Sequence, residues 1–268
     1  MKSIYPERII CLSDETTEVL YLLGEEKRIV GISCFTVRPP VARKEKPIIS
    51  SFTGANIEKI VHLKPDLILG FSDLQADIIK NLIKSGLQVH VFNQRTIQGI
   101  LEMILMVGAM VGAHKKAEVL ITKLEEQIEQ VRKKSQTKSR KPIVYFEEWE
   151  EPFICGIGWV SELIDIGGGI DCFAELAKNS LAHDRIILEQ SEVPRRKPDI
   201  IIGSWCGKRF LPEKVKNRKG WKEIPAVRNG HIYEIRSSDI LQPGPAALSS
   251  GLNQIHSIFL NWQLKNCC

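Results

Sequence analysis

The feature that most constrains the fold of this chain is an internal repeat. The stretch Lys64-Pro65-Asp66-Leu67-Ile68-Leu69-Gly70 recurs as Lys197-Pro198-Asp199-Ile200-Ile201-Ile202-Gly203, so that the second copy begins 133 residues after the first in a chain of 268. Proline ends a preceding helix, an apolar triplet is typical of a short buried parallel strand, and glycine permits a sharp turn. Each copy also follows a helix-like stretch and precedes an aromatic residue, Phe71 or Trp205. The repeat predicts two similar halves.

Strand and helix patterns alternate through both halves, which predicts a parallel-rich sheet in each. In the first half we expect strands at 9–12, 29–33, 67–69 and 89–92, with helices at 14–23 and 73–84. In the second half we expect strands at 143–146, 200–202 and 232–235, with helices at 159–166 and 246–263. The predicted class is α/β, with two similar lobes that each contain a short parallel-rich sheet flanked by helices.

The segment between the halves has the apolar spacing of a helix. Apolar residues from Ile97 to Val131 form a helical stripe, and a bend at Gly108 and Gly112 would allow one helix or a broken pair. A helical connector makes a stiffer hinge than a loop. We therefore expect an N-terminal α/β lobe at 1–96, a connecting helix at 97–138 and a C-terminal α/β lobe at 139–268.

Composition and charge exclude several classes of protein. The chain is 43% hydrophobic and 26% charged, with a net charge of +5, which is ordinary for a globular protein. Its basic stretches at 132–141 and 208–222 do not resemble a nucleic-acid reading module, so we expect no nucleic-acid partner. No segment approaches the roughly 20 apolar residues of a membrane span, so we expect no transmembrane segment.

The N-terminus and the cysteines indicate a compartment. Residues 1–8 are polar and lack the pattern of a secretory signal, and the seven cysteines are odd in number without CxxC spacing. We therefore expect a cytoplasmic protein in a reducing environment, or a periplasmic or cell-surface one if the true start lies upstream. The adjacent Cys267 and Cys268 could hold a lipid or a metal, although a frayed tail is the favoured interpretation, and their role stays open.

A series of motifs carries a resemblance to a known family. The motifs are Arg8-Ile9-Ile10-Cys11-Leu12-Ser13 with Thr17-Glu18, Val30-Gly31-Ile32-Ser33 leading to Pro39-Pro40, Asn56-Ile57-Glu58-Lys59-Ile60 through Lys64-Pro65-Asp66, the set Gly108, Gly112 and Ala117, and Pro243-Gly244-Pro245. In this order and spacing the chain resembles the helical-backbone substrate-binding proteins of ABC importers, the cobalamin and iron-chelate family, and especially its cobalamin-binding branch.

The resemblance implies a fold and a function. It implies two α/β lobes joined by one long helix, with a ligand held between them and no catalysis. The expected ligand is a cobalamin-like corrinoid or an iron or other metal chelate, the expected partner is an ABC permease, and we expect a monomer without an intrinsic cofactor. Two departures leave the ligand's identity open. Val37 and Arg38 replace the usual Asp and Tyr, and Gln242 and Ala246 replace arginines around the final Pro-Gly-Pro.

The expected ligand-binding residues lie where strands end. By resemblance they include Phe35, Phe71 and the loop Glu147-Glu148-Trp149, and the repeat adds Trp205. Two general observations support this placement. Ligands of open α/β sheets bind beyond the carboxyl ends of the strands, and broad aromatic side chains suit a flat macrocycle. Phe71 and Trp205 could instead pack under the loops.

The acidic residues around Trp149 have two interpretations. Glu147, Glu148, Glu150 and Glu151 could bind a hard cation or a cationic ligand group, or they could form a solvated acidic loop. If the strand continues, Glu147 and Glu148 point in opposite directions and only one faces the ligand. We predict no metal site, because no histidine pair has metal-ligand spacing and Cys34 and Cys206 fit better as free thiols.

Two further glutamates are candidates for partner docking. Glu58 begins the helix before the first repeat, and Glu192 lies one residue from the equivalent place in the second. In the family one acidic residue on each lobe pairs with arginines of the membrane partner, but exposed glutamates on a helix can also simply be solvated, which is the interpretation we favour.

Two other functions are compatible with these residues besides ligand binding for transport. One is a cytosolic sensing or interaction protein that keeps the fold with a repurposed ligand cleft. The other is a cleft enzyme that uses Glu147 or Glu148 as a general base, with Cys155 nearby. No nucleophile, base and orienting group form a visible set, so we predict a binding protein with no catalytic residue.

Overall fold

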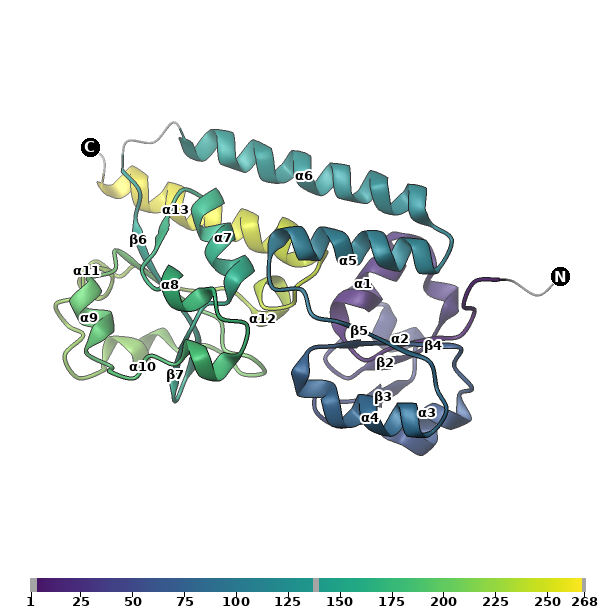
Figure 1. The fold of residues 1–268 in the computed structure, drawn as a ribbon. Coiled ribbons are helices and arrows are strands. Elements are labelled where there is room, and N and C mark those ends of the chain that lie inside the picture. The colour runs from purple at the N-terminus through teal and green to yellow at the C-terminus, as the bar shows by residue number, and fades with distance from the viewer. Residues whose placement is uncertain (1–3, 137–139, 267–268) are drawn as a thin grey trace. The chain divides into compact units, whose positions relative to one another are not determined.

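The chain forms two compact units in a computed structural model that describes residues 4–136 and 140–266. Unit 1 comprises Met1–Gln94 and Gln98–Lys123, and unit 2 comprises Arg95–Ile97 and Leu124–Cys268. The ribbon of each unit is drawn in Figure 1. Cys267 and Cys268, whose role the sequence left open, lie outside the described residues.

Unit 1 is built on a five-stranded sheet in the order β3-β2-β1-β4-β5, and every pair in it is parallel. Its buried apolar core includes Ile10, Leu12, Ile68 and Leu82. The strands are β1 (Ile9–Cys11), β2 (Ile29–Ser33), β3 (Ile48–Ser50), β4 (Leu67–Phe71) and β5 (Val89–Phe92); the helices are α1 (Asp14–Leu22), η1 (Glu26–Arg28), α2 (Ala42–Glu45), α3 (Ile57–His62), η2 (Asp73–Gln75), α4 (Ala76–Lys84) and α5 (Ile97–Met110).

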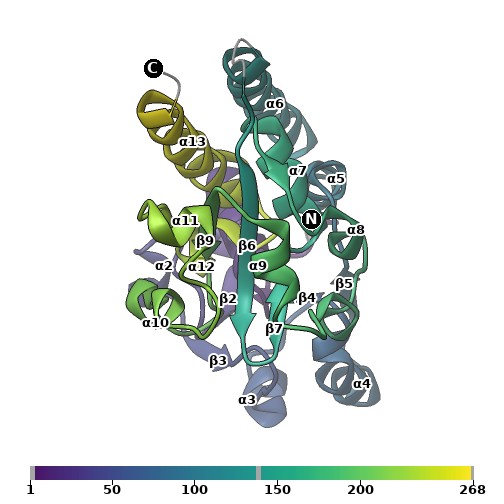
Figure 2. The same cartoon turned by 90° about the vertical axis from the view of Figure 1, so that its left-hand side faces the viewer.

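Unit 2 has a second five-stranded sheet, in the order β10-β9-β6-β7 with β8 also paired to β6. Figure 2 shows β6 running through the unit to its hairpin with β7, which is the antiparallel pair. The strands are β6 (Ile143–Glu150), β7 (Phe153–Cys155), β8 (Ile170–Asp171), β9 (Ile200–Gly203) and β10 (Ile232–Glu234); the helices are α7 (Gly158–Ile166), α8 (Ala174–Ala177), η3 (Ala182–Arg185), α9 (Glu192–Arg196), α10 (Pro212–Lys216), α11 (Pro225–Arg228), α12 (Ser237–Ile240), η4 (Ala247–Gly251) and α13 (Leu252–Asn266). The predicted α/β class with two parallel-rich sheets is confirmed.

The two repeat copies occupy matching places in the two sheets. β4 pairs in parallel with β1 and β5, and β9 pairs in parallel with β6 and β10. The lysine that opens each copy has a left-handed backbone, with φ of 46° at Lys64 and 48° at Lys197. The predicted strands at 67–69 and 200–202 are therefore confirmed, and each has a neighbour on both sides in its own sheet.

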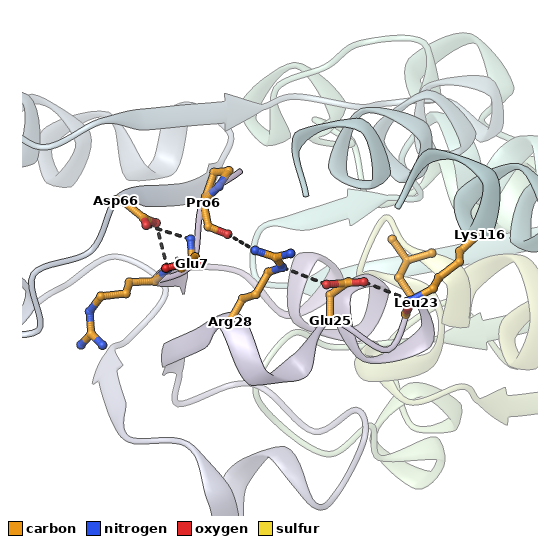
Figure 3. Close-up of polar contacts among 8 residues, drawn as sticks. Pro6, Glu7, Leu23, Glu25, Arg28, Asp66 and Lys116 are labelled. Carbon is orange, nitrogen blue, oxygen red and sulfur yellow. Dashed lines mark hydrogen bonds and ion pairs between the residues drawn. The ribbon is translucent and has the colours of Figure 1, made fainter. Parts of the chain in front are cut away.

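The aspartate of each copy starts the neighbouring strand. The carboxylate of Asp66 accepts backbone hydrogen bonds from Glu7 and Arg8, at 2.8 and 2.9 Å, immediately before β1 (Figure 3). The carboxylate of Asp199 accepts a backbone hydrogen bond of 3.0 Å from Ile143, where β6 begins. A carboxylate that accepts a backbone N–H makes a charge-assisted bond, so the motif fixes where the adjacent strand enters the sheet.

The segment after unit 1's sheet is the broken pair of helices that the sequence allowed, α5 followed by α6 (His114–Gln136). Gly112 has a φ of +74°, which ends α5, and a Cβ on Gly108 would lie 2.4 Å from the Cβ of Ala117, so only glycine permits this close approach of the two helices. Lys116 on α6 then donates to Leu23 O and Glu25, at 2.8 and 3.0 Å (Figure 3). The boundary between the units falls within α6, after Lys123.

Several elements differ from their predicted bounds, and three short strands were not predicted. β6 continues to Glu150 instead of ending at residue 146, because its last residues pair with β7. The short β3, β7 and β8 were missed, since two or three residues carry little periodicity. The closing helix begins with a π-helical turn over 247–251. Among the described residues, no helix is both long enough and apolar enough to cross a membrane.

Candidate ligand-binding surface

In unit 1, two predicted aromatic residues follow the carboxyl ends of parallel strands but differ in exposure. Phe35 lies two residues beyond β2, and 42% of it is exposed. Phe71 is the last residue of β4 and is 6% exposed. Its backbone N–H donates to Gln75 Oε1 at 2.9 Å, and the amide nitrogen of Gln75 in turn bonds the backbone carbonyl of Leu12. Phe35 therefore presents an aromatic face, whereas Phe71 lies among side chains that hold the end of β4.

A hollow lies beside the ends of β4 and β5 in unit 1. Its volume is about 640 Å³, and its polar lining comes from Ser72, Asp73, Asn93 and two lysines of α4, Lys80 and Lys84. Apolar side chains of α4 and β5 form the rest of its wall. None of these residues was predicted as a site from the sequence, because their types are common on any exposed surface.

In unit 2, the carboxylate of Glu147 is buried and fully engaged. It is 0% exposed and accepts hydrogen bonds from both terminal nitrogens of Arg218, at 2.5 and 2.9 Å. The hydroxyl of Tyr145 and the indole N–H of Trp205 also donate to it, each at 3.0 Å. A buried carboxylate is stable when it is paired in this way, so Glu147 organises the interior at the end of β6.

Glu148 is bound by a different arginine. It is partly exposed, and its carboxylate accepts hydrogen bonds from both terminal nitrogens of Arg185, at 2.5 and 3.1 Å. Arg185 is itself 2% exposed and also donates to the backbone carbonyl of Cys155 at 2.6 Å. Glu147 and Glu148 therefore have different arginine partners, and the pairing of β6 with β7 is irregular between Glu147 and Trp149.

Trp149 presents a half-buried indole at the end of β6. Its ring faces the ammonium group of Lys208, which lies 4.3 Å from the ring centroid, and its N–H donates to the carbonyl of Glu151 at 2.9 Å. Lys208 also bonds Glu150 at 2.5 Å, and Lys214 bonds the same carboxylate at 2.8 Å. The Trp149 ring is therefore held by a cation over its face and by a hydrogen bond from its N–H group.

Trp205 packs inside unit 2. It is 2% exposed, belongs to the apolar core there and makes an edge contact with Phe210, with ring centroids 4.9 Å apart. It lies two residues beyond β9, whereas Phe71 is the final residue of β4, so the two aromatics do not occupy the same place relative to their strands. Its hydrogen bond to Glu147 links it to the partly exposed residues on β6.

The acidic residues around Trp149 do not form a solvated acidic loop. Glu147, Glu148 and Glu150 lie on β6, and cationic side chains of Arg218, Arg185, Lys208 and Lys214 neutralise them. Glu151 is exposed in the turn between β6 and β7. In the described part of the chain, no group of three or more His, Cys, Asp or Glu side chains could hold a metal ion.

The described cysteines Cys11, Cys34, Cys155, Cys172 and Cys206 are free thiols. Burial raises the pKa of Cys11 and of Cys155 to about 12, which keeps both protonated and unreactive at neutral pH. Cys34 is partly buried and Cys206 is exposed.

The two candidate docking glutamates have different surroundings. Glu58 is exposed in the first turn of α3. Glu192 begins α9 and forms ion pairs with Arg195 and Arg196 of the same helix. These ion pairs would have to open before Glu192 bound another cation.

Three comparisons relate the chain to known proteins. A family model described as periplasmic binding protein matches residues 9–238. The chain is 26% identical to an uncharacterized ABC transporter substrate-binding lipoprotein of Bacillus subtilis, over 95% of this chain and 80% of that protein. It is 25% identical to a vitamin B12-binding protein of Vibrio parahaemolyticus, over 91% of this chain and 86% of that one. Its fold resembles that of a possible iron-binding (periplasmic solute-binding) protein from Staphylococcus epidermidis, with a TM-score of 0.80, 23% identity and coverage of 95% and 98%.

Proposed function

Because this chain belongs to the periplasmic binding protein family, whose members bind substrates and catalyse no reaction, we propose that it is the substrate-binding component of an ABC-type uptake system. We propose a cobalamin-like corrinoid or an iron chelate as its ligand. The relatives named as a vitamin B12-binding protein and as a possible iron-binding protein support this class.

The observation that carries the proposal is the placement of Trp149 and Phe35. Each is a partly exposed aromatic side chain at the carboxyl end of a central strand or just beyond it, in the region where open α/β sheets bind ligands. An aromatic face stacks on a flat macrocycle and buries a large apolar area. In this proposal Phe35 and Trp149 contact the ligand directly.

The other predicted site residues support those contacts. Glu147 joins Trp205 to Arg218, and Arg185 fixes Glu148, so these groups set the position of the strand end that carries Trp149. The buried Phe71 ends β4, where its backbone N–H bonds Gln75. We assign Phe71, Glu147 and Trp205 a positioning role, and Glu148 contact with a polar edge of the ligand.

The same contacts argue against the cleft-enzyme alternative. A general base needs a carboxylate that can take up a proton from a substrate. Glu147 and Glu148 each accept two hydrogen bonds from an arginine, so the carboxylate oxygens that would have to accept a substrate's proton already have partners. Neither glutamate is suited to that role.

Titration calorimetry with cyanocobalamin, dicyanocobinamide and hemin tests the ligand class. We expect saturable binding of at least one compound, and a loss of roughly 1–3 kcal/mol when Phe35→Ala or Trp149→Ala removes a stacking face. Leu22→Ala in unit 1 and Leu188→Ala in unit 2 are controls, since these side chains are 54% and 91% exposed. Binding that ignored both aromatic changes would refute the site, and no binding to any compound would refute the ligand class.

The ABC permease partner has a separate test. Glu58 and Glu192 are the proposed docking residues, one on each unit. Uptake of the bound ligand should fall in a strain that carries Glu58→Ala, while ligand affinity of the purified variant stays unchanged. Normal ligand binding together with uptake that did not depend on this chain would favour the sensing alternative.

A further inference from the structure

The hollow beside α4 and β5 in unit 1 is apolar along most of its wall. Ala76, Ile79 and Ile83 of α4 and Val91 of β5 contribute this part of the lining. Its volume of about 640 Å³ lies within the range of roughly 300–1,000 Å³ that is usual for small-molecule sites, which are themselves mostly apolar. The hollow therefore has the size and the lining of a binding site.

Two of these apolar side chains are exposed to water. Ile83 is 59% exposed, and Val91 is 40% exposed. β5 lies at the end of the sheet order β3-β2-β1-β4-β5, so among the described residues no further strand covers its outer edge. Apolar side chains that are exposed together, in a hollow at a sheet edge, are typical of a surface that binds another molecule.

Lys80 and Lys84 give the hollow a positive charge at one end. They lie four residues apart on α4, so their side chains are neighbours on one face of the helix. Within residues 4–136 and 140–266, neither ammonium group has an ion-pair or hydrogen-bond partner. Two like charges one helical turn apart repel each other, and an anion placed between them would relieve that repulsion.

Asp73 is the one carboxylate among the lining residues, and it lies at the other end of the hollow. It precedes α4, whereas Lys80 and Lys84 lie in the second half of that helix. The seven residues between Asp73 and Lys80 correspond to roughly 10 Å along the helix axis. An anion held by the two lysines would therefore not meet the charge of Asp73 directly.

We infer that this hollow binds an amphipathic anion, namely an alkyl or acyl chain that ends in a carboxylate or a phosphate. The chain covers Ile79, Ile83 and Val91, and the headgroup lies between the ammonium groups of Lys80 and Lys84. Lysine binds both kinds of anion, because its ammonium group acts as a compact point charge. The site is a second one, since none of its residues is among those proposed to contact or position the metal chelate.

Titration calorimetry with four probes below their micellar concentrations tests the inference. Decanoate and decyl phosphate carry the same length of chain with different anionic headgroups, decyltrimethylammonium carries that chain with a positive charge, and acetate is a carboxylate without the chain. We expect saturable binding of decanoate, of decyl phosphate or of both, and the tighter of the two identifies the headgroup. We expect no binding of decyltrimethylammonium or acetate, and equally tight binding of either one would refute the inference.

Variants of the two lysines locate the headgroup. Lys80→Gln combined with Lys84→Gln should weaken binding of the anionic probe by roughly tenfold or more, and Lys80→Arg combined with Lys84→Arg should retain it. Lys115→Gln combined with Lys123→Gln is the matched control, because it removes the same charge from two exposed lysines of α6 that also lack a partner in the described part of unit 1. An equal loss of affinity in the two glutamine variants would show unspecific attraction and would refute the site.

A charge on the apolar wall locates the chain. Ile83→Asp should abolish binding of the anionic probe, whereas Leu22→Asp on α1 should leave it unchanged, because Leu22 has a similar exposure of 54% and lies outside the lining. Both side chains are exposed, and circular dichroism checks that the variants are folded. If wild type binds neither decanoate nor decyl phosphate, the inference is wrong. That result would not affect the proposed function, which is tested with metal chelates and with variants of Phe35 and Trp149.

Discussion

Arg218 places both of its terminal nitrogens on the carboxylate of Glu147, at distances of 2.5 and 2.9 Å. The same guanidinium lies over the rings of Phe153 and Trp221, 4.4 and 4.6 Å from their centroids. The carboxylate has no exposed surface, and Trp205 donates its indole N–H to it. This pair therefore ties the end of β6 to the aromatic core of unit 2.

Removing the arginine should leave the buried carboxylate of Glu147 without an opposite charge, although Tyr145 and Trp205 still donate hydrogen bonds to it. We expect Arg218→Met to lower the free energy of unfolding by roughly 3–5 kcal/mol, measured by urea denaturation followed by tryptophan fluorescence. A double variant that adds Glu147→Gln should recover part of this loss, because the buried charge is then absent. Lys216→Met, at an exposed ion pair, should change stability by less than about 1 kcal/mol. Equal effects of the two single variants would contradict the account.

The equivalent aspartates of the repeat should differ in importance. Asp66 is exposed, whereas Asp199 is 9% exposed and also takes a hydrogen bond of 3.1 Å from Arg140. We expect Asp66→Ala to lower the free energy of unfolding by about 0.5–1.5 kcal/mol, and Asp199→Ala to lower it by about 1–3 kcal/mol, because a lost bond costs more where water cannot replace it. Chemical denaturation of both variants measures the two losses in free energy of unfolding. A larger loss for Asp66→Ala than for Asp199→Ala would contradict the prediction.

The glycines that end the two repeat copies should also respond unequally to substitution. A Cβ on Gly203 would lie 1.9 Å from the Phe210 ring, whereas a Cβ on Gly70 would lie 2.8 Å from Ile79 Cδ1. The end of an isoleucine can turn aside, but a buried ring cannot do so without moving its neighbours. We expect Gly203→Ala to reduce the free energy of unfolding by roughly 1–3 kcal/mol and Gly70→Ala to reduce it less. Thermal unfolding of the two variants gives the comparison.

Glu15 should make stability depend on pH. Burial, together with repulsion from Asp14 and Glu18, raises the pKa of its carboxyl group from 4.5 to about 8, although a hydrogen bond from Ser13 lowers it in part. The folded protein therefore holds this proton between about pH 4.5 and 8 while the unfolded chain releases it. The stabilising contribution is complete below pH 4.5 and is lost as the pH rises toward 8.

Glu15→Gln should remove that dependence. The variant's free energy of unfolding relative to wild type should rise by up to about 1.4 kcal/mol per pH unit across this window. Denaturation curves at pH 5, 6, 7 and 8 measure the difference. Parallel pH profiles for the two proteins would show that the carboxyl group titrates normally in the folded state.

The sequence by itself determined the elements and their repetition. The predicted strands at 29–33 and 89–92 have the observed bounds, and the Lys-Pro-Asp repeat marked β4 and β9 correctly. These features depend on neighbouring residues: a proline that ends a helix, an apolar run that needs burial on both faces, and a glycine at a turn. The family resemblance, too, rests on short motifs in a fixed order.

Only the tertiary structure decided the charge and exposure of the candidate site. The glutamates of β6 were predicted to lie in a loop, and their partners Arg185, Lys208 and Arg218 come from 37, 58 and 71 residues further along the chain. Trp149 is half-buried while Trp205 is enclosed, although both are tryptophans near strand ends. The local sequence pattern around a residue predicts whether it lies in a strand or a helix. The partner of a buried charge depends instead on which distant segments pack against it, and this is decided only when the whole unit folds.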